Sequence, residues 1–202
     1  MLSKAKISKY LRDYKLLFLS DKMRFFIIKF KNKKNNHLFK KNNPNIILPP
    51  DYLMYESFRL DYKRYFEGGK NTANWLKEIF GKHKNLENLK ILDWGCGPAR
   101  VIRHFPNILN NSVFFGTDYN EDSIIWNKKN IKNVNFNLNS LEAKLPYENN
   151  FFDVIYGISI FTHLSEEKHL EWKKELYRIL KPEGILLLTL QGDAFKSILT
   201  EE

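Results

Sequence analysis

The segment of residues 90–100 constrains the fold of this chain more than any other part of the sequence. A short apolar run there ends in Asp93, and Gly95 and Gly97 follow, spaced by a single residue. The next run, residues 101–105, has the composition of a helix. Strand, glycine turn and helix in this order are typical of the place where a parallel sheet holds a nucleoside ligand. Glycines suit such a turn because they adopt strained backbone angles and let a ligand approach closely.

A second acidic residue supports a nucleoside site. The apolar run at residues 113–117 ends in Asp118. This is about twenty residues beyond the glycines, where a carboxylate can accept both hydroxyls of a ribose. The third small position of the glycine motif is weak, because Ala99 and Arg100 stand where the two common variants have glycine. The glycines alone fit an ordinary strand-to-helix connection equally well, and Asp118 favours the ligand site.

Apolar runs and polar segments alternate through the rest of the chain. We expect strands at residues 90–93, 113–117, 133–137, 152–156 and 184–190. We expect helices at residues 100–105, 121–129 and 166–180, and one from a cap at Asn71 or Thr72 through Phe80, after a break at Gly68-Gly69. This alternation predicts an α/β fold with a Rossmann-like parallel sheet and helices on both of its faces.

The positive charge of the chain is concentrated near its N-terminus. Residues 1–44 contain 13 Lys or Arg and 2 acidic residues, whereas residues 45–202 contain 20 and 21. We therefore expect a basic helical N-terminal arm with a linker at 1–44 and a folded domain at 45–202. Within the arm, residues 7–30 have the spacing of an amphipathic helix, and the Lys/Asn-rich residues 31–45 predict a solvated linker.

Two interpretations of the arm stay open. A basic amphipathic helix within residues 1–30 can lie on an anionic membrane surface, or the helix packs on its own domain or is a solvated tail. We expect no specific nucleic-acid binding, because no recognised nucleic-acid module accompanies the charge. No apolar stretch reaches the ~20 residues of a membrane span, and the first residues do not resemble a secretory signal. The expected location is therefore cytoplasmic.

Cysteine and metal-ligand usage excludes several kinds of site. Cys96 is the only cysteine, which excludes an internal disulfide and a Cys-rich metal centre. Its position inside the glycine turn fits a small packing residue better than a nucleophile, because no His or Asp is placed in the sequence as its partner. No cluster of metal ligands appears elsewhere, so we expect no metal.

Four segments taken together resemble class I S-adenosylmethionine-dependent methyltransferases over residues 48–192. They are ILDWGCGPAR, GTDYNEDSI, LPYENNFFDVIYGISIFTHL and WKKELYRILKPEGILLLTL, in this order. The SIFTHLSEE segment after the fourth strand is especially similar to bacterial enzymes of this class. Members of the family usually have seven strands, and this sequence stops soon after the fifth. The resemblance therefore implies a sheet that lacks the last two strands.

The resemblance implies roles for particular residues. The cofactor-binding residues would be Asp93, Gly95, Gly97, Asp118, Tyr119, Asn139, Ser140, Leu141, Tyr156 and Gly157. Asp118 would bind the ribose hydroxyls, Tyr119 would lie beside the adenine, and residues 139–141 would contact the adenine edge. Ser140 departs from the family, which often has Asp there. Tyr156 and Gly157 would line the methionine and methyl region.

The implied reaction is transfer of the methyl group of S-adenosylmethionine to a small-molecule, saccharide or lipid acceptor, at oxygen. His163 is the candidate general base for a hydroxyl acceptor, because it follows the fourth strand near the expected methyl group. Its alternative role is structural, at the start of the loop. No Asn/Asp-Pro-Pro-Tyr follows the strand, which argues against methylation of amide or exocyclic base nitrogens.

Residues 185–190 would form the edge of a five-stranded sheet. An apolar edge invites pairing, so we expect it to be covered by the arm or to pair in a homo-oligomer. The same short C-terminus leaves a second class of function open, namely a truncated, non-catalytic domain that binds the cofactor or a partner. A nicotinamide-dependent dehydrogenase is disfavoured by Arg100 and by the motifs that follow Asp118.

Overall fold

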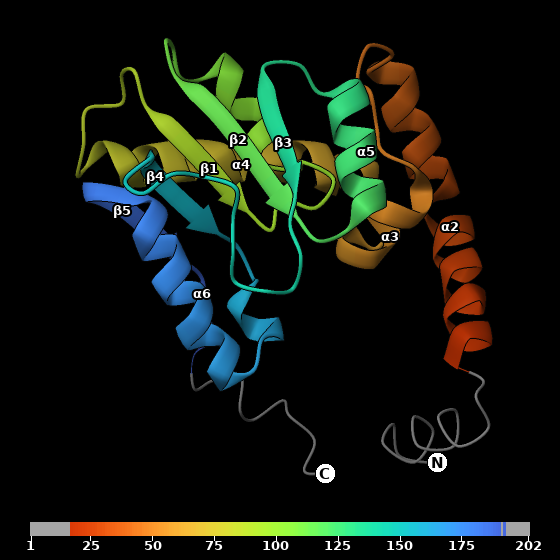
Figure 1. The fold of residues 1–202 in the computed structure, drawn as a ribbon. Helices are drawn as coiled ribbons and strands as arrows, with labels where there is room; N and C mark the ends of the chain where they lie inside the picture. Colours follow the sequence, from red (N-terminus) through yellow and green to blue (C-terminus); the bar gives the residue numbers. More distant parts are fainter. Residues whose placement is uncertain (1–16, 191, 193–202) are drawn as a thin grey trace. The chain divides into compact units, whose positions relative to one another are not determined.

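The computed structural model describes residues 17–190 and residue 192 (Figure 1). By its internal packing the chain divides into two compact units, which are described separately. One comprises the described residues up to Lys63, and the other is Arg64–Leu190. The domain boundary after residue 44 that the charge pattern predicts stays a prediction.

The unit Arg64–Leu190 is built on a five-stranded sheet. Its strands are β1 (Lys90–Trp94), β2 (Val113–Asp118), β3 (Val134–Leu138), β4 (Phe152–Gly157) and β5 (Leu180–Leu188). They lie in the order β3-β2-β1-β4-β5, and every neighbouring pair is parallel. The predicted Rossmann-like parallel sheet is therefore confirmed. Among the described strands, β3 and β5 form the two edges.

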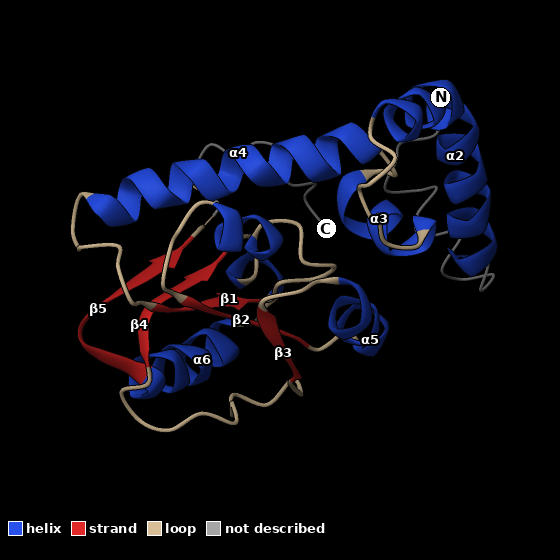
Figure 2. Cartoon of the chain, turned by 90° about the horizontal axis from the view of Figure 1, so that it is seen from above, coloured by secondary structure: helices blue, strands red, loops and turns tan. Residues whose placement is uncertain are grey.

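Helices cover both faces of this sheet, as Figure 2 shows for α4 and α6. Helices α4 (Tyr62–Gly81) and α5 (Glu121–Asn130) share one apolar cluster with alternate residues of the strands, whereas α6 (Glu166–Ile179) packs into the other. β1 illustrates the alternation, because Ile91 belongs to the first cluster and Leu92 to the second. This two-sided burial explains the continuous apolar runs of the strands.

The predicted helix break at Gly68-Gly69 is wrong. Helix α4 runs through both residues without interruption. A Cβ atom on Gly69 would overlap the backbone carbonyl oxygen of Arg100. Gly69 is therefore required by the close packing of two segments of backbone, which is a tertiary reason that local sequence does not reveal.

Two other elements differ from the sequence predictions. The predicted helix at 100–105 is a short 3-10 helix, Ile102–Asn107, which contains Pro106. Proline lacks an N–H and clashes with the preceding turn of an α-helix. Strand β5 begins at Leu180 rather than at 184, and its pairing with β4 shifts register between Phe152 and Val154. Pro182 lies in this irregular part, which is where an edge strand tolerates proline.

The unit before Arg64 consists of α2 (Leu17–Asn42), α3 (Asp51–Phe58) and the start of α4. The predicted solvated linker at 31–45 is wrong for most of its length, because α2 continues to Asn42. Asn36 is buried and binds the segment after α3: its Nδ2 donates to the Leu60 carbonyl at 2.9 Å, and its Oδ1 accepts from the Tyr62 N–H at 3.1 Å. An Asn-rich stretch therefore provides structural hydrogen bonds here.

The first part of the predicted arm helix, residues 7–16, lies outside the described residues. None of the helices in residues 17–190 is long and apolar enough to cross a membrane.

Candidate cofactor site

The turn after β1 is fastened to the end of β2 through backbone atoms. The N–H groups of Gly95 and Cys96 both donate to the carbonyl oxygen of Thr117, at 2.8 and 2.9 Å. The turn closes on itself through the Ala99 N–H, which donates to the Cys96 carbonyl at 3.0 Å. Because β1 and β2 are parallel neighbours, these bonds bring the two predicted motifs together at the carboxyl edge of the sheet.

Asp118 completes this connection with its side chain. Its Oδ2 accepts the Gly97 N–H at 2.7 Å, and its Oδ1 accepts the Asn120 N–H at 2.8 Å. Burial raises the pKa of Asp118, and the backbone N–H groups of Asn120 and Gly97 oppose that rise. A carboxylate has about four lone-pair sites, so Asp118 keeps capacity to accept ligand hydroxyls.

The two glycines of the turn have different surroundings. Both have positive φ, +77° at Gly95 and +50° at Gly97. A Cβ on Gly95 would overlap the side chain of Ile160, whereas a Cβ on Gly97 would meet no atom within 4 Å. Space is therefore open directly over Gly97, and this is where a ligand can approach the backbone.

Helix α4 holds the outer side of the turn. The Tyr65 hydroxyl donates to the Pro98 carbonyl at 2.6 Å and accepts a hydrogen bond from Arg103 at 3.0 Å. Arg100, which stands at a motif position for glycine, donates to the Thr72 hydroxyl at 3.3 Å. Neither Tyr65 nor Thr72 is among the residues expected at the site, because no motif distinguishes them from other helix residues. Their contribution depends on how α4 packs.

Asp93 lies inside the protein beneath this turn. Burial raises its pKa to about 7, and interactions with Tyr156 and Arg100 oppose the rise. The Tyr156 side chain is fully buried and packs against Phe80 and Phe105, and no group of the described residues meets hydrogen-bond geometry with its hydroxyl. Both side chains therefore lie in the core.

The segment after β3 reaches the same edge of the sheet. The Asn139 N–H donates to the backbone carbonyl of Asp118 at 3.1 Å. The Oδ1 atom of Asn139 is buried and has no hydrogen-bond partner among the described residues. Ser140 and Leu141 are exposed, as is Tyr119 at the end of β2. An unpaired buried acceptor beside exposed apolar side chains suits a ligand that carries an N–H donor on a flat ring.

The predicted residues after β4 are divided between core and surface. A Cβ on Gly157 would lie 2.8 Å from Trp94 and 3.1 Å from Leu188, so Gly157 belongs to the packing of the sheet. His163 ends a short 3-10 helix, Phe161–His163, and is exposed. Its backbone N–H donates to the Ile160 carbonyl at 3.0 Å. The structure thus joins His163 through the backbone to the residue that covers Gly95.

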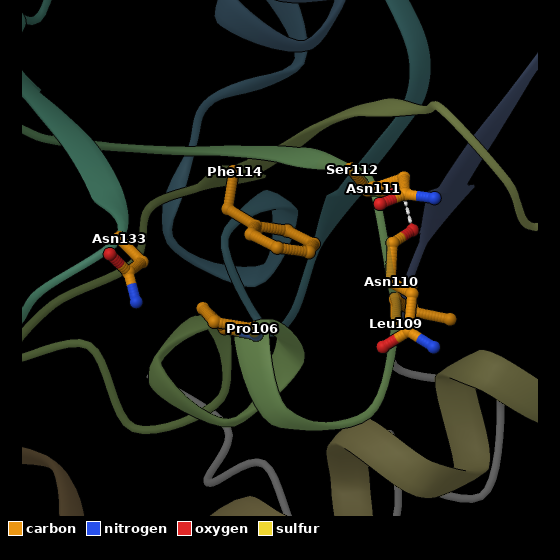
Figure 3. A pocket seen from close by; sticks show the side chains of 7 residues that line it. All are labelled: Pro106, Leu109, Asn110, Asn111, Ser112, Phe114 and Asn133. Atoms are coloured by element: carbon orange, nitrogen blue, oxygen red, sulfur yellow. Dashed lines mark hydrogen bonds between the residues drawn. The ribbon is translucent and has the colours of Figure 1, made fainter.

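An open pocket of about 450 Å³ lies elsewhere, beside the amino-terminal end of β2, and Figure 3 shows the residues that line it. It is lined by Pro106, Leu109, Asn110, Asn111, Ser112, Phe114 and Asn133. Ser112 immediately precedes β2 and Phe114 is its second residue, whereas Asp118 ends that strand. Its polar groups are partly engaged, since the Ser112 hydroxyl donates to the Asn110 carbonyl at 3.3 Å and accepts the Leu89 N–H at 3.1 Å. The pocket is separate from the residues gathered around Asp118.

Part of the chain is similar in sequence to known methyltransferases. Residues 91–184 match a family model described as a methyltransferase domain. An uncharacterized methyltransferase of Schizosaccharomyces pombe is 28% identical over 106 aligned residues, and the match covers 47% of this chain and 37% of that protein. An uncharacterized protein of Haemophilus influenzae is 26% identical over 154 aligned residues, and the match covers 70% of this chain and 58% of that protein.

A solved structure shows the same fold. The PH0226 protein of Pyrococcus horikoshii superimposes with a TM-score of 0.51 at 24% identity, covering 67% of this chain and 65% of that one. The chain spans between a third and three fifths of the length of the two curated relatives. The family match covers the turn after β1, Asp118 and the segments after β3 and β4. Residues 91–184 are therefore similar in sequence to methyltransferase domains, and the solved structure shares the fold of this chain.

Proposed function

We propose that this chain binds S-adenosylmethionine at the carboxyl edge of its sheet and transfers the methyl group to an oxygen of a small-molecule, saccharide or lipid acceptor. The observation that carries the proposal is the joint built by Gly97 and Asp118. The acid that would bind a ribose holds the turn over which the cofactor would lie, and the space over Gly97 is open. The methyltransferase family match supports the same assignment.

The residues around this joint fit the parts of the cofactor. Asp118 would accept the ribose hydroxyls, because its carboxylate retains lone pairs beyond those used by backbone N–H groups. The buried Oδ1 of Asn139 would accept a hydrogen bond from the amino group of adenine. Such a bond would remove the energetic cost of an unsatisfied buried acceptor. The exposed side chains of Tyr119 and Leu141 would cover the faces of the ring.

The chemistry separates what the cofactor brings from what the chain does. S-adenosylmethionine supplies a methyl group on a positively charged sulfur, which is already a good leaving group. The chain's residues bind and orient the reactants, and orientation can lower a barrier by about 7–11 kcal/mol in well-aligned systems. A ring nitrogen of His163 would take the proton from the acceptor hydroxyl, and its exposure lets an acceptor reach it.

Calorimetric titration with S-adenosylmethionine and S-adenosylhomocysteine tests the cofactor site. We expect micromolar binding by the wild type and at least about tenfold weaker binding by Asp118→Ala, because hydrogen bonds to a charged group are worth about 1.5–3 kcal/mol. Asp122→Ala is the matched control, since it removes the same charge from an exposed position of α5. A well-folded wild type that binds neither compound would support the alternative of a non-catalytic domain.

Release of S-adenosylhomocysteine in the presence of candidate acceptors tests the reaction. With a hydroxyl acceptor, His163→Gln should lower the rate about 10²–10⁴-fold, the usual contribution of a general base, while the cofactor affinity stays unchanged. An unchanged rate in His163→Gln would remove the histidine from the mechanism and leave it a structural residue of the loop.

A further inference from the structure

Helix α2 carries apolar side chains on two different sides. On one side Phe25 contacts Tyr52 and Tyr55 of α3, with ring centroids 5.7 and 5.3 Å away. Buried Phe39 and Asn36 continue this side toward the C-terminal end of the helix. The packing of the unit therefore uses one side of α2 only.

A second group of apolar residues on α2 is exposed. We call it the α2 apolar face, and its members are Leu19, Met23, Phe26, Ile27 and Phe30. Phe30 is 80% exposed and Phe26 is 64% exposed. With about 100° of rotation per residue, positions 19, 23, 26 and 30 fall on one side of a helix. Large apolar residues grouped in this way mark an interaction surface rather than random exposure.

Positive charge surrounds the α2 apolar face. By helical spacing, Lys22 and Lys33 flank it on one side and Arg24 and Lys31 on the other, and all four are exposed. Residues 17–44 contain eight Lys or Arg and a single acidic residue, Asp21. The carboxylate of Asp21 accepts a hydrogen bond from the Tyr55 hydroxyl at 2.8 Å, on the packed side. The partner of this face should therefore be apolar and bordered by negative charge.

We propose that α2 lies in the surface of a bilayer that contains anionic lipids. The α2 apolar face would enter the boundary between headgroups and acyl chains, and the flanking Lys and Arg would reach the lipid phosphates. Long basic side chains suit this place because their stems are apolar and their charges reach water or phosphate. A protein partner would also have to match this charge with acidic groups, whereas an anionic bilayer supplies both properties over its whole area. The inference does not depend on the cofactor site.

Co-flotation of the full chain with vesicles tests the proposal. One set of vesicles is phosphatidylcholine, and the other is an equimolar mixture of phosphatidylcholine and phosphatidylglycerol. We expect at least tenfold stronger binding to the anionic vesicles, with a decrease as the salt concentration rises, because salt screens the attraction of the basic residues. Equal or absent binding to the two sets would overturn the proposal.

The triple variant Phe26→Ser/Ile27→Ser/Phe30→Ser tests the surface itself. It replaces exposed residues, so circular dichroism and cofactor titration should match the wild type, while binding to anionic vesicles should fall at least tenfold. The matched control is Leu170→Ser/Tyr177→Ser on α6, where two exposed apolar residues have no part in the α2 apolar face. Vesicle binding unchanged in the triple variant would contradict the proposal. The proposal would also be contradicted if the wild type binds no vesicles and is a dimer that the triple variant converts to a monomer. The α2 apolar face would then join two copies of the chain.

Discussion

At the scale of single residues, the two glycines of the turn have separable duties. Gly95 is covered by Ile160, so it is required for packing, whereas Gly97 faces open space. Both adopt positive φ, yet Ala99 in the same turn also does so, at 55°. A side chain at such an angle therefore costs energy without being impossible, and the cost is roughly 1–2 kcal/mol.

Alanine substitutions should separate folding from binding. Gly95→Ala should lower the free energy of unfolding by about 3 kcal/mol, because backbone strain is added to overlap with Ile160. Gly97→Ala should cost only about 1–2 kcal/mol but weaken S-adenosylmethionine binding, because the new methyl group fills the open space. Urea unfolding and calorimetry measure the two effects. In an Ile160→Ala background the Gly95→Ala penalty should shrink, and the Gly97→Ala penalty should not. Equal behaviour of the two glycines would contradict this division.

Asp93 should make stability depend on pH near neutrality. Its pKa is raised from 3.8 to about 7, so between these values the folded protein holds a proton that the unfolded chain has lost. The contribution of Asp93 is therefore complete at low pH and is lost as the pH rises through 7. A shift of three units corresponds to at most about 4 kcal/mol. Relative to the wild type, Asp93→Asn should gain stability between pH 4 and pH 8, measured by urea unfolding.

The comparison with a variant matters because another buried group changes the free energy of unfolding with pH in the opposite direction. Burial lowers the pKa of His104 to about 4, so its contribution to stability is lost as the pH falls. The histidine is present in both proteins and cancels in the difference. A difference between wild type and Asp93→Asn that stays constant with pH would show that the Asp93 pKa is unshifted.

The sequence predicts which residues gather at this site better than it predicts what each one contacts. Asp118 and Gly97 are recognisable because their types and spacing follow from ligand chemistry. Ile160 and Tyr65 are not, because an apolar residue over a glycine and a tyrosine bonded to a carbonyl leave no pattern in the chain. The cofactor contacts expected of these residues, including the buried Tyr156, stay predictions that binding measurements on variants would test.

At the scale of elements, α4 shows how a neighbouring backbone segment can determine which residue a helix accepts. Gly69 meets the backbone of Arg100, whereas the nearest atom to a Cβ on Gly68 would be a side-chain nitrogen of Arg100 at 3.9 Å. The same dipeptide that predicts a break therefore contains one residue that the fold requires and one that it tolerates.

These neighbouring glycines form a matched pair of variants. Gly68→Ala should stabilise the protein by as much as about 1 kcal/mol, because alanine is the better helix former. Gly69→Ala should destabilise it by about 2–4 kcal/mol despite the same gain in propensity, because the helix must move away from the turn. Thermal unfolding distinguishes the two. A similar shift in Tm for both variants would mean that the packing of α4 on the turn is loose.

Prediction of the elements succeeds where local pattern and tertiary environment agree. The apolar runs of β1, β2 and β4 are each buried on both faces, so pattern and burial coincide. The start of β5 escapes prediction because Lys181-Pro182-Glu183-Gly184 has the composition of a turn, although the edge of a sheet accepts it. The C-terminal half of α2 escapes prediction because its asparagines have the composition of a linker. Their structural role depends on hydrogen bonds with Leu60 and Tyr62, which local sequence does not show.

At the scale of the whole molecule, the two ends of the parallel strands carry different features. Asp118, Gly97 and Asn139 meet at the carboxyl ends of the strands, whereas the pocket of about 450 Å³ lies at the start of β2 and before β3. Parallel sheets place ligands outside the carboxyl ends of their strands. This pocket is therefore not the expected cofactor site.

Substitution in this pocket should leave cofactor binding intact. Asn110 is exposed and lines the pocket, and only its backbone carbonyl takes part in the hydrogen bond with Ser112. Asn110→Ala should therefore bind S-adenosylmethionine within about twofold of the wild type, since a distant surface change leaves binding nearly untouched. Calorimetry with the same protein preparations checks this. A tenfold loss in Asn110→Ala would move the cofactor to the pocket and overturn the assignment at Asp118.

The double duty of Asp118 has a consequence for how such a site can be transplanted or diverge. Its carboxylate accepts the Gly97 and Asn120 N–H groups, and the neighbouring Thr117 carbonyl receives two more N–H groups from the turn. A protein engineer who grafts the turn into another sheet must carry the end of β2 with it. Even a glutamate in place of Asp118, longer by one methylene, would have to rebuild the turn. The turn and the end of β2 must therefore be transferred or altered together, although some twenty residues separate them along the chain.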